Sequence, residues 1–348
     1  MPPILMAERE ASAAAEQPIL SVRGLKTYFR ADEGVVRAVD GVTFDVRPGR
    51  TLGIVGESGC GKSITARSIL GIVDRPGRIE AGEIWLRPGG TGAPIDLAKL
   101  DPRGPEMRAI RGKEIALVFQ EPMSSFSHYY TVGNQIMEAI LLHSDATKQQ
   151  AHDRAIELLR LVGVPKPERR VDEYPFQLSG GLRQRVMIAM ALACDPHVLI
   201  ADEPTTALDV TTQAQILDLM RELQAKRALA LILITHDMGV IAEMADDVVV
   251  MYLGRVVERG PVDEIFHSPR HPYTQSLLRS IPSIMATPRT KLATISGSIP
   301  HPLNRPGGCP FHPRCPDFKP GVCDKAEPQA TIFDDRREVS CFLYGGGA

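Results

Sequence analysis

Short apolar runs alternate with amphipathic stretches along most of this chain. Runs rich in apolar and β-branched residues predict strands at residues 20–23, 35–46, 51–55, 115–119, 198–201 and 229–235, the second of them broken at Asp40 and Gly41. Helices are predicted at residues 63–70, 131–177, 182–193 and 213–227; within residues 151–164, apolar residues recur three and four positions apart. Strands that alternate with helices predict an α/β fold on a mostly parallel sheet.

Both ends of the chain and one internal stretch depart from this pattern. Residues 1–18 are rich in Ala and Glu and are expected to be flexible, and the Gly- and Pro-rich residues 88–105 predict a surface excursion. Beyond about residue 260, Pro and His become frequent. We therefore expect a flexible N-terminus at 1–18, a large domain at 19–262 with a helical subdomain at about 122–180, and a loop-rich region at 263–348.

Composition narrows the class of protein. The chain has 348 residues, and 40 basic against 42 acidic side chains give a net charge of −2, which argues against a generally basic nucleic-acid-binding protein. The most apolar stretch, residues 228–234, is far shorter than the roughly 20 residues of a membrane-spanning helix. The N-terminus has no basic-then-apolar layout, so we expect no signal peptide and a cytoplasmic location.

A glycine-rich turn follows the strand predicted at residues 51–55 and precedes a helix. Its sequence, GESGCGKS, has the spacing G-x-x-x-x-G-K-[ST], in which glycines turn backbone N–H groups onto phosphate oxygens. Lys62 is expected to reach the β- and γ-phosphates and Ser63 to hold Mg²⁺. A chance match is the alternative, but the flanking strand and helix favour nucleotide binding. The candidate residues are Gly56, Glu57, Ser58, Gly59, Cys60, Gly61, Lys62, Ser63 and Ile64.

Two carboxylates end the strand predicted at residues 198–201. Asp202 is expected to hold Mg²⁺ through water, and Glu203 to orient and deprotonate an attacking water. The alternative is that two acidic residues simply end a strand at its solvent edge. His236 ends the strand at residues 229–235, where a side chain faces the ligand crevice of a parallel sheet and could contact a γ-phosphate.

Further motifs occur around these residues. Gln120 follows the strand at residues 115–119, the run LSGGLRQR begins at residue 178, and ALD occupies residues 207–209. The Ser-Gly-Gly turn offers backbone N–H groups and a helix N-terminus to a phosphate, while Ser179 is also a plain helix cap; both can hold together. The residues are Gln120, Leu178, Ser179, Gly180, Gly181, Gln184, Ala207, Leu208 and Asp209.

In this order, over about residues 18–260, the motifs resemble those of ATP-binding-cassette (ABC) ATPases. The resemblance implies the P-loop ABC-cassette fold: a mostly parallel core sheet, an antiparallel β subdomain and a helical subdomain. It also implies a head-to-tail pair that sandwiches two ATP molecules, in which Lys62, Ser63, Asp202 and Glu203 of one subunit face Ser179 and Gly181 of the other.

The resemblance assigns roles to single residues as well. Gln120 is implied to contact Mg²⁺ or the water and to relay to a membrane partner, and Lys62 and His236 are implied to stabilise charge on the γ-phosphoryl group. An aromatic residue before the phosphate loop is implied to stack on adenine. Phe29 is our choice and Tyr28 the alternative, although this aromatic pair can equally belong to the core.

The C-terminal region narrows the resemblance. Residues 271–282 and 308–316 look like the C-terminal extension of ATP-binding subunits of dipeptide, oligopeptide and nickel importers, in which four cysteines are implied to hold a 4Fe–4S cluster. Judged from the residues alone, the four cysteines could bind an iron–sulfur cluster or zinc, or could be free thiols or disulfides. No C-x-x-C pair is present, which makes zinc the weaker of the two metal alternatives. The remaining cysteines, Cys60 and Cys194, are read as packing or loop residues. The implied ligands are Cys309, Cys315, Cys323 and Cys341.

The resemblance implies an ATPase that powers peptide import from the cytoplasmic face of the inner membrane. Implied partners are a second, related ABC ATPase in a heterodimer, two transmembrane permease subunits and an extracytoplasmic solute-binding protein, with no nucleic acid. The run after Gln120 departs from the usual Leu-Asn-Pro-like sequence at residues 126–128, so an oligosaccharide or nickel importer stays an alternative. So do a soluble non-transport ABC ATPase and a redox role for the tail cysteines.

Overall fold

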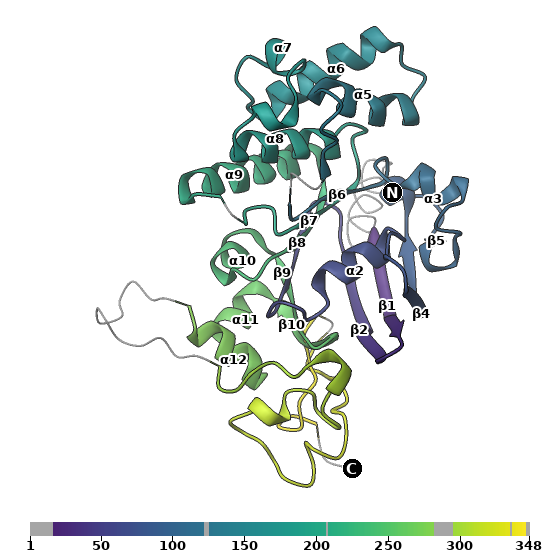
Figure 1. Cartoon of the computed structure of the whole chain (residues 1–348). Coiled ribbons are helices and arrows are strands. Elements are labelled where there is room, and N and C mark those ends of the chain that lie inside the picture. The colour runs from purple at the N-terminus through teal and green to yellow at the C-terminus, as the bar shows by residue number, and fades with distance from the viewer. Residues whose placement is uncertain (1–16, 122–124, 207, 282–294, 335, 346–348) are drawn as a thin grey trace, which may run out of the picture. The chain divides into compact units, whose positions relative to one another are not determined.

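The fold is described by a computed structural model at residues 17–121, 125–206, 208–281, 295–334 and 336–345 (Figure 1). The chain divides into two compact units, each made of several segments. The first holds the residues up to 20, 46–50 and 86–233, and the second holds 21–45, 51–85 and 234 to the C-terminus. The boundaries of these units differ from those of the predicted domains. The predicted domains remain a prediction.

The first unit combines short buried strands with a group of helices. Strands β6 (Ile115–Val118) and β7 (Val198–Asp202) pair in parallel, and β8 (Ala230–Ile234) lies on the other side of β7. All five residues of β7 and of β8 are buried, as expected for strands covered on both faces. The helices are α3 (Pro105–Ile110), α5 (Val132–His143), α6 (Lys148–Leu161), α7 (Pro167–Arg170), α8 (Gly180–Ala191) and α9 (Val210–Arg227).

Helices α5, α6 and α8 pack together in this unit, as Figure 1 shows. The α6 face that carries Ala151, Ala155, Leu158 and Leu159 is fully buried, so the predicted recurrence of apolar residues marks the packed face. Thr147 starts α6 with a capping box to Gln150. The 88–105 stretch contains a two-residue strand, β5 (Ile95–Asp96), and 3-10 turns.

The second unit contains two sheets. Strands β1 (Leu20–Ala31) and β2 (Gly34–Val46) form a hairpin around a two-residue turn, and β4 (Gly77–Leu86) lies beside β1. The other sheet has the strand order β11-β12-β10-β9-β3. Its strands are β3 (Thr51–Val55), β9 (Asp247–Tyr252), β10 (Arg255–Pro261), β11 (Thr331–Ile332) and β12 (Glu338–Val339). Its helices are α2 (Lys62–Ile69), α10 (Met238–Met244), α11 (Val262–His267) and α12 (Pro272–Arg279).

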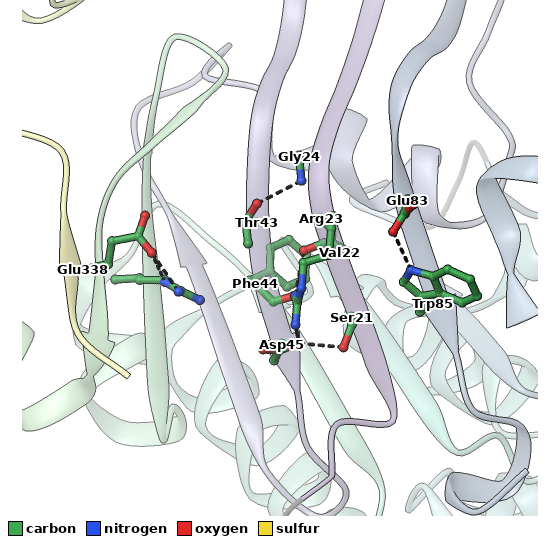
Figure 2. A network of polar contacts seen from close by, with 11 residues as sticks. Ser21, Val22, Arg23, Gly24, Thr43, Phe44, Asp45, Glu83, Trp85 and Glu338 are labelled. Carbon is green, nitrogen blue, oxygen red and sulfur yellow. Dashed lines mark hydrogen bonds and ion pairs between the residues drawn. The ribbon is translucent and has the colours of Figure 1, made fainter. Parts of the chain in front are cut away.

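Polar side chains fix the pairing of these strands (Figure 2). On the β1–β2 hairpin, Ser21 and Arg23 both donate to Asp45, at 2.6 Å each. Figure 2 also shows Glu338 of β12, which accepts from Arg259 of β10 at 2.8 Å. Through β11 and β12, the C-terminal region thus supplies the last two strands at one edge of this sheet.

Two predictions differ from the structure. The strand at residues 35–46 is not broken: β2 runs through Asp40 and Gly41, because glycine tolerates the φ of +89° that the bend requires. The region after residue 260 contains α11 and α12 as well as loops; α12 begins at Pro272, where the missing N–H of proline costs nothing. No helix among the described residues is long and apolar enough to cross a membrane.

Candidate functional site

The phosphate-loop motif has the geometry that its sequence predicts. It leaves the buried strand β3 at Gly56 and enters α2 at Lys62. Gly56, Gly59 and Gly61 have φ of +150°, +78° and +103°. A Cβ on Gly56 would lie 2.2 Å from the Met251 carbonyl oxygen, and one on Gly61 would lie 2.1 Å from that of Ala38. Both positions therefore require glycine because neighbouring backbone approaches them.

The lysine of the loop is buried and points back into it. The Nζ atom of Lys62 donates to the carbonyl oxygens of Gly56 and Glu57, at 2.7 and 3.2 Å. Cys60 is buried, and desolvation raises the pKa of its thiol. Ser63 and Ile64 lie in the first turn of α2. Ser58 is exposed.

The C-terminal region contacts this loop, which the sequence did not predict. The backbone N–H of Glu57 donates to the Tyr273 hydroxyl at 2.8 Å. The carboxylate of Glu57 accepts two hydrogen bonds from Arg314, at 2.7 and 3.0 Å. Nothing local in the sequence marks these partners, since they lie 216 and 257 residues away along the chain.

In the first unit, Gln120 and Glu203 meet at the ends of two parallel strands. Val118 of β6 is level with Ala201 of β7, so residues just beyond both strands come together. The Gln120 side-chain amide donates to Glu203 at 3.0 Å, and the Thr206 hydroxyl donates to the same oxygen at 2.9 Å. Asp202 is buried at the end of β7.

The backbone of Glu203 is strained. Its φ of +49° lies in the left-handed region, which non-glycine residues rarely adopt. Such strain is concentrated at functional sites. Together with the donors Gln120 and Thr206, the strained turn fixes the direction in which the carboxylate points. A carboxylate that merely ends a strand at its solvent edge requires neither a strained backbone nor hydrogen-bond donors.

The LSGG motif forms the start of α8, and Ser179 is its N-cap, as predicted. The Ser179 hydroxyl accepts from the Leu182 N–H at 3.4 Å. Gly180 has open space around its Cα, whereas a Cβ on Gly181 would lie 2.8 Å from the Thr212 methyl carbon. Leu178 and Gln184 are buried.

Thr212 also connects to the ALD motif. Asp209 caps α9 by accepting from the Thr212 N–H at 2.9 Å and hydroxyl at 2.7 Å, and the backbone hydrogen bond lowers the pKa of Asp209. Leu208 donates its N–H to Thr205. Ala207 lies outside the described residues. The LSGG and ALD motifs thus contact one residue, Thr212.

The structure places the remaining predicted residues in the second unit. His236 is exposed and precedes Asp237, the N-cap of α10. The Tyr28 hydroxyl donates to Asp40 at 2.7 Å, and burial with this hydrogen bond raises the pKa of Tyr28 to about 12. The Phe29 ring packs against Gly77 and occupies the space that a Cβ on this residue would need. Both aromatic side chains thus have partners within the second unit, and the choice of Phe29 over Tyr28 for adenine stays a prediction.

The four tail cysteines line one pocket in the second unit. Its other walls include His271, Phe311, Phe342 and Leu343. Backbone hydrogen bonds join the cysteine segments, as from the Cys309 N–H to the Cys323 carbonyl at 2.8 Å. Among the described residues, no three His, Cys, Asp or Glu side chains are arranged around a single ion. The cysteines are Cys309, Cys315, Cys323 and Cys341.

Comparisons with known proteins agree with this geometry. The family model described as ABC transporter matches residues 39–206, and that described as oligopeptide/dipeptide transporter, C-terminal region, matches residues 257–323. A putative peptide import ATP-binding protein of Brucella melitensis is 50% identical over 95% of this chain and 98% of its own. The dipeptide transport ATP-binding protein DppD of Escherichia coli (strain K12) is 47% identical over 93% of this chain and 96% of its own.

Solved structures of ABC transporter cassettes are similar to this chain in fold. A dimeric bacterial ABC transporter cassette is 26% identical with a TM-score of 0.61, covering 70% of this chain and 98% of that one. A post-hydrolysis state of that cassette, bound to ADP and Pi, is 25% identical with a TM-score of 0.61 and the same coverage. The fold, the phosphate loop and the strained turn at Glu203 therefore agree with the comparisons. The chain is an ABC ATPase and belongs to the ATP-binding proteins of the dipeptide and oligopeptide transporter family.

Proposed function

We propose that this protein hydrolyses ATP to power the import of peptides through a membrane transporter. The observation that carries the hydrolysis step is the Glu203 carboxylate, held by Gln120 and Thr206 on a strained turn at the end of β7. The peptide cargo is supported by the relatives, which are peptide and dipeptide import ATP-binding proteins, and by the matching C-terminal region.

The roles of the residues follow from their chemistry. The backbone N–H groups of the phosphate loop and the N-terminus of α2 would bind the phosphates, with Lys62 moving from the loop carbonyls to the β/γ oxygens. Glu203 would take the proton of the attacking water. Gln120 would hold that carboxylate and His236 the γ-phosphate.

The residues proposed to hold Mg²⁺ carry oxygen donors, which suit this ion. The hydroxyl of Ser63 lies in the first turn of α2, and Gln120 and Asp202 lie at the ends of neighbouring strands. When bound, Mg²⁺ would neutralise charge on the phosphate oxygens. The Ser63 hydroxyl, the Asp202 carboxylate and the Gln120 amide would hold it.

The cassette is proposed to work in a pair. Ser179 and Gly181, with the N-terminus of α8, would bind the γ-phosphate held by the phosphate loop of a second cassette. The dimeric state of the related cassette supports this arrangement. The further partners are two permease subunits and a solute-binding protein, with the ATPase peripheral on the cytoplasmic face of the inner membrane.

The tail cysteines are proposed to hold a 4Fe–4S cluster. Each thiolate of such a cluster binds a different iron, so the ligands surround a small pocket rather than one point, and four buried or half-buried thiols around an apolar pocket fit this need. The protein purified without oxygen should absorb visible light and contain iron, and Cys309→Ser should remove both. A colourless protein with stoichiometric zinc would replace this proposal with a structural zinc site.

Transport itself is testable in vesicles that contain the whole complex. Wild-type protein should take up labelled dipeptide only with ATP, and Glu203→Gln should keep binding ATP but stop uptake. Uptake of an oligosaccharide or of nickel instead of peptide would reassign the cargo. Hydrolysis at the wild-type rate by Glu203→Gln would refute the assignment of the base.

A further inference from the structure

Two residues of the C-terminal region contact one residue of the phosphate loop, and one of the two also donates a hydrogen bond to β9. Tyr273 in α12 accepts from the Glu57 N–H, and Arg314 donates both terminal nitrogens to the Glu57 carboxylate. One of these nitrogens also lies 3.3 Å from the Tyr252 hydroxyl at the end of β9. All these residues belong to the same compact unit.

The ion pair is largely removed from water. The Arg314 side chain is 4% exposed and that of Glu57 is 22% exposed. Hydrogen bonding to Glu57 raises the pKa of Arg314, so the guanidinium stays charged. Its Nε donates to the Ser296 carbonyl at 3.1 Å. A planar, two-pronged contact of this kind fixes direction as well as distance, which a lysine in its place would not do.

An aromatic cluster holds the two tail residues in place. The rings of Tyr252, Tyr273 and Phe311 are all fully buried, and their centroids lie 4.7 to 5.3 Å apart in tilted and edge-on pairs. Tyr252 ends β9, which pairs in parallel with β3, the strand that leads into the loop. The contact to Glu57 is therefore built on the sheet itself.

Glu57 in turn contacts the lysine of the loop. Its carbonyl oxygen accepts from Lys62 at 3.2 Å, while its N–H and carboxylate are held from the tail. All three polar groups of Glu57 are thus engaged at once. Rotation of the Glu57 peptide would move the carbonyl at Lys62 and change the direction of the neighbouring N–H groups.

We propose that Arg314 and Tyr273 are positioning residues for ATP: by holding Glu57, the C-terminal extension keeps the phosphate loop preset for nucleotide phosphates. This inference rests on the proposed ATPase function. The extension then contributes to ATP affinity, and not only to the stability of its own fold. Neither residue touches the reacting atoms, so binding should change and the rate at saturating ATP should not.

The chain offers a matched control. Arg337 is also a buried arginine of the tail, but it pairs with Glu258 and Glu264, away from the phosphate loop. Arg314→Met removes the ion pair of Glu57, and Arg337→Met removes the ion pairs of Glu258 and Glu264, so both should lower stability. Tyr273→Phe keeps the packed ring and removes only the hydroxyl, which protects the test against misfolding.

The experiment measures KM and kcat of the intact transporter complex, and the Kd of the full-length chain for a fluorescent ATP analogue. Arg314→Met should raise Kd and KM about tenfold and Tyr273→Phe about threefold, with kcat unchanged. Arg314→Lys should recover part of the loss, and Arg337→Met should leave Kd at the wild-type value. In Glu57→Gln, the Arg314→Met change should add little.

Two results would overturn the inference. One is a wild-type Kd in both Arg314→Met and Tyr273→Phe; the other is an equal rise in Kd in Arg314→Met and Arg337→Met, because the effect would then follow stability alone. A wild-type chain that does not bind the analogue would refute the proposed ATPase function itself, and with it this inference.

Discussion

The phosphate loop and the LSGG turn are both glycine-rich turns that open a helix, yet they are held in different ways. The LSGG turn is held by neighbours in sequence: Ser179 caps the Leu182 N–H, and Arg183 donates to the Pro175 carbonyl. The phosphate loop is held at Glu57 by residues 216 and 257 positions away. Similar motifs can therefore differ in whether their support is local, and distant support makes the loop sensitive to changes in the tail.

The largest effect should come from a change at Glu203, which is proposed to act in hydrolysis and not in ATP binding. Glu203→Gln keeps the shape and the hydrogen-bond acceptor but removes the base, so the rate should fall about 10²- to 10⁴-fold while ATP affinity is retained. Single-turnover hydrolysis and ATP titration measure the two quantities. Thr206→Val, which removes one hydrogen-bond donor to the carboxylate, should have a smaller effect on the rate.

A pair of glycine variants compares the two turns directly. Gly61→Ala places a Cβ 2.1 Å from the Ala38 carbonyl at a φ of +103°, so it should destabilise the second unit by about 2 kcal/mol or more and abolish ATP binding. Gly180→Ala meets open space in a helical turn, so the free energy of unfolding should stay equal or rise by up to about 1 kcal/mol. Denaturant unfolding of both variants is the measurement. Equal losses would contradict the comparison.

Acid should weaken the distant support of the loop. His271 is fully buried, burial lowers its pKa to about 3, and its Nδ1 accepts from the Tyr273 N–H to cap α12. The unfolded chain binds this proton near pH 6.5 and the folded chain does not. Stability is therefore complete above pH 6.5 and declines as the pH falls, by about 2 kcal/mol between pH 6.5 and 5.

Unfolding at several pH values checks this effect. His271→Asn keeps a capping acceptor but does not titrate, so its stability should change less over the same range. The same slope in both proteins would assign the acid sensitivity to other groups.

The smallest effect is expected at the LSGG cap. Ser179→Ala removes one local hydrogen bond and should cost about 1 kcal/mol of stability. Ser179→Asp keeps the cap and adds negative charge where a partner's γ-phosphate would lie, so its stability should be normal and its hydrolysis poor. Normal hydrolysis by Ser179→Asp would argue against the proposed role of this turn in the paired cassette.

The sequence predicted those parts of the site whose geometry is local. The strand predicted at residues 51–55 coincides with β3, and the helix after the loop, the Ser179 cap and the two carboxylates at the end of β7 lie where expected. Each depends on residues within one turn or one strand. The meeting of Gln120 with Glu203 adds one further step, the parallel pairing of β6 and β7.

The rest depends on contacts that no local pattern contains. Arg314 lies among prolines and cysteines, and its sequence neighbours do not indicate a partner at Glu57. Strands β9 and β10 were not predicted, although β9 provides the backbone that makes Gly56 necessary. The sequence predicts a loop-rich tail and no helix there, whereas α12 carries Tyr273 to the phosphate loop. Only the tertiary fold brings these segments together.

The most direct test compares the Arg314 support of the phosphate loop with the Glu203 carboxylate in one assay. Hydrolysis by the intact complex should be measured as a function of ATP concentration for Arg314→Met and Glu203→Gln. We expect a raised KM with normal kcat for Arg314→Met, and a kcat lowered at least about 10²-fold with ATP binding retained for Glu203→Gln. A normal KM for Arg314→Met, or wild-type turnover by Glu203→Gln, would contradict this expectation.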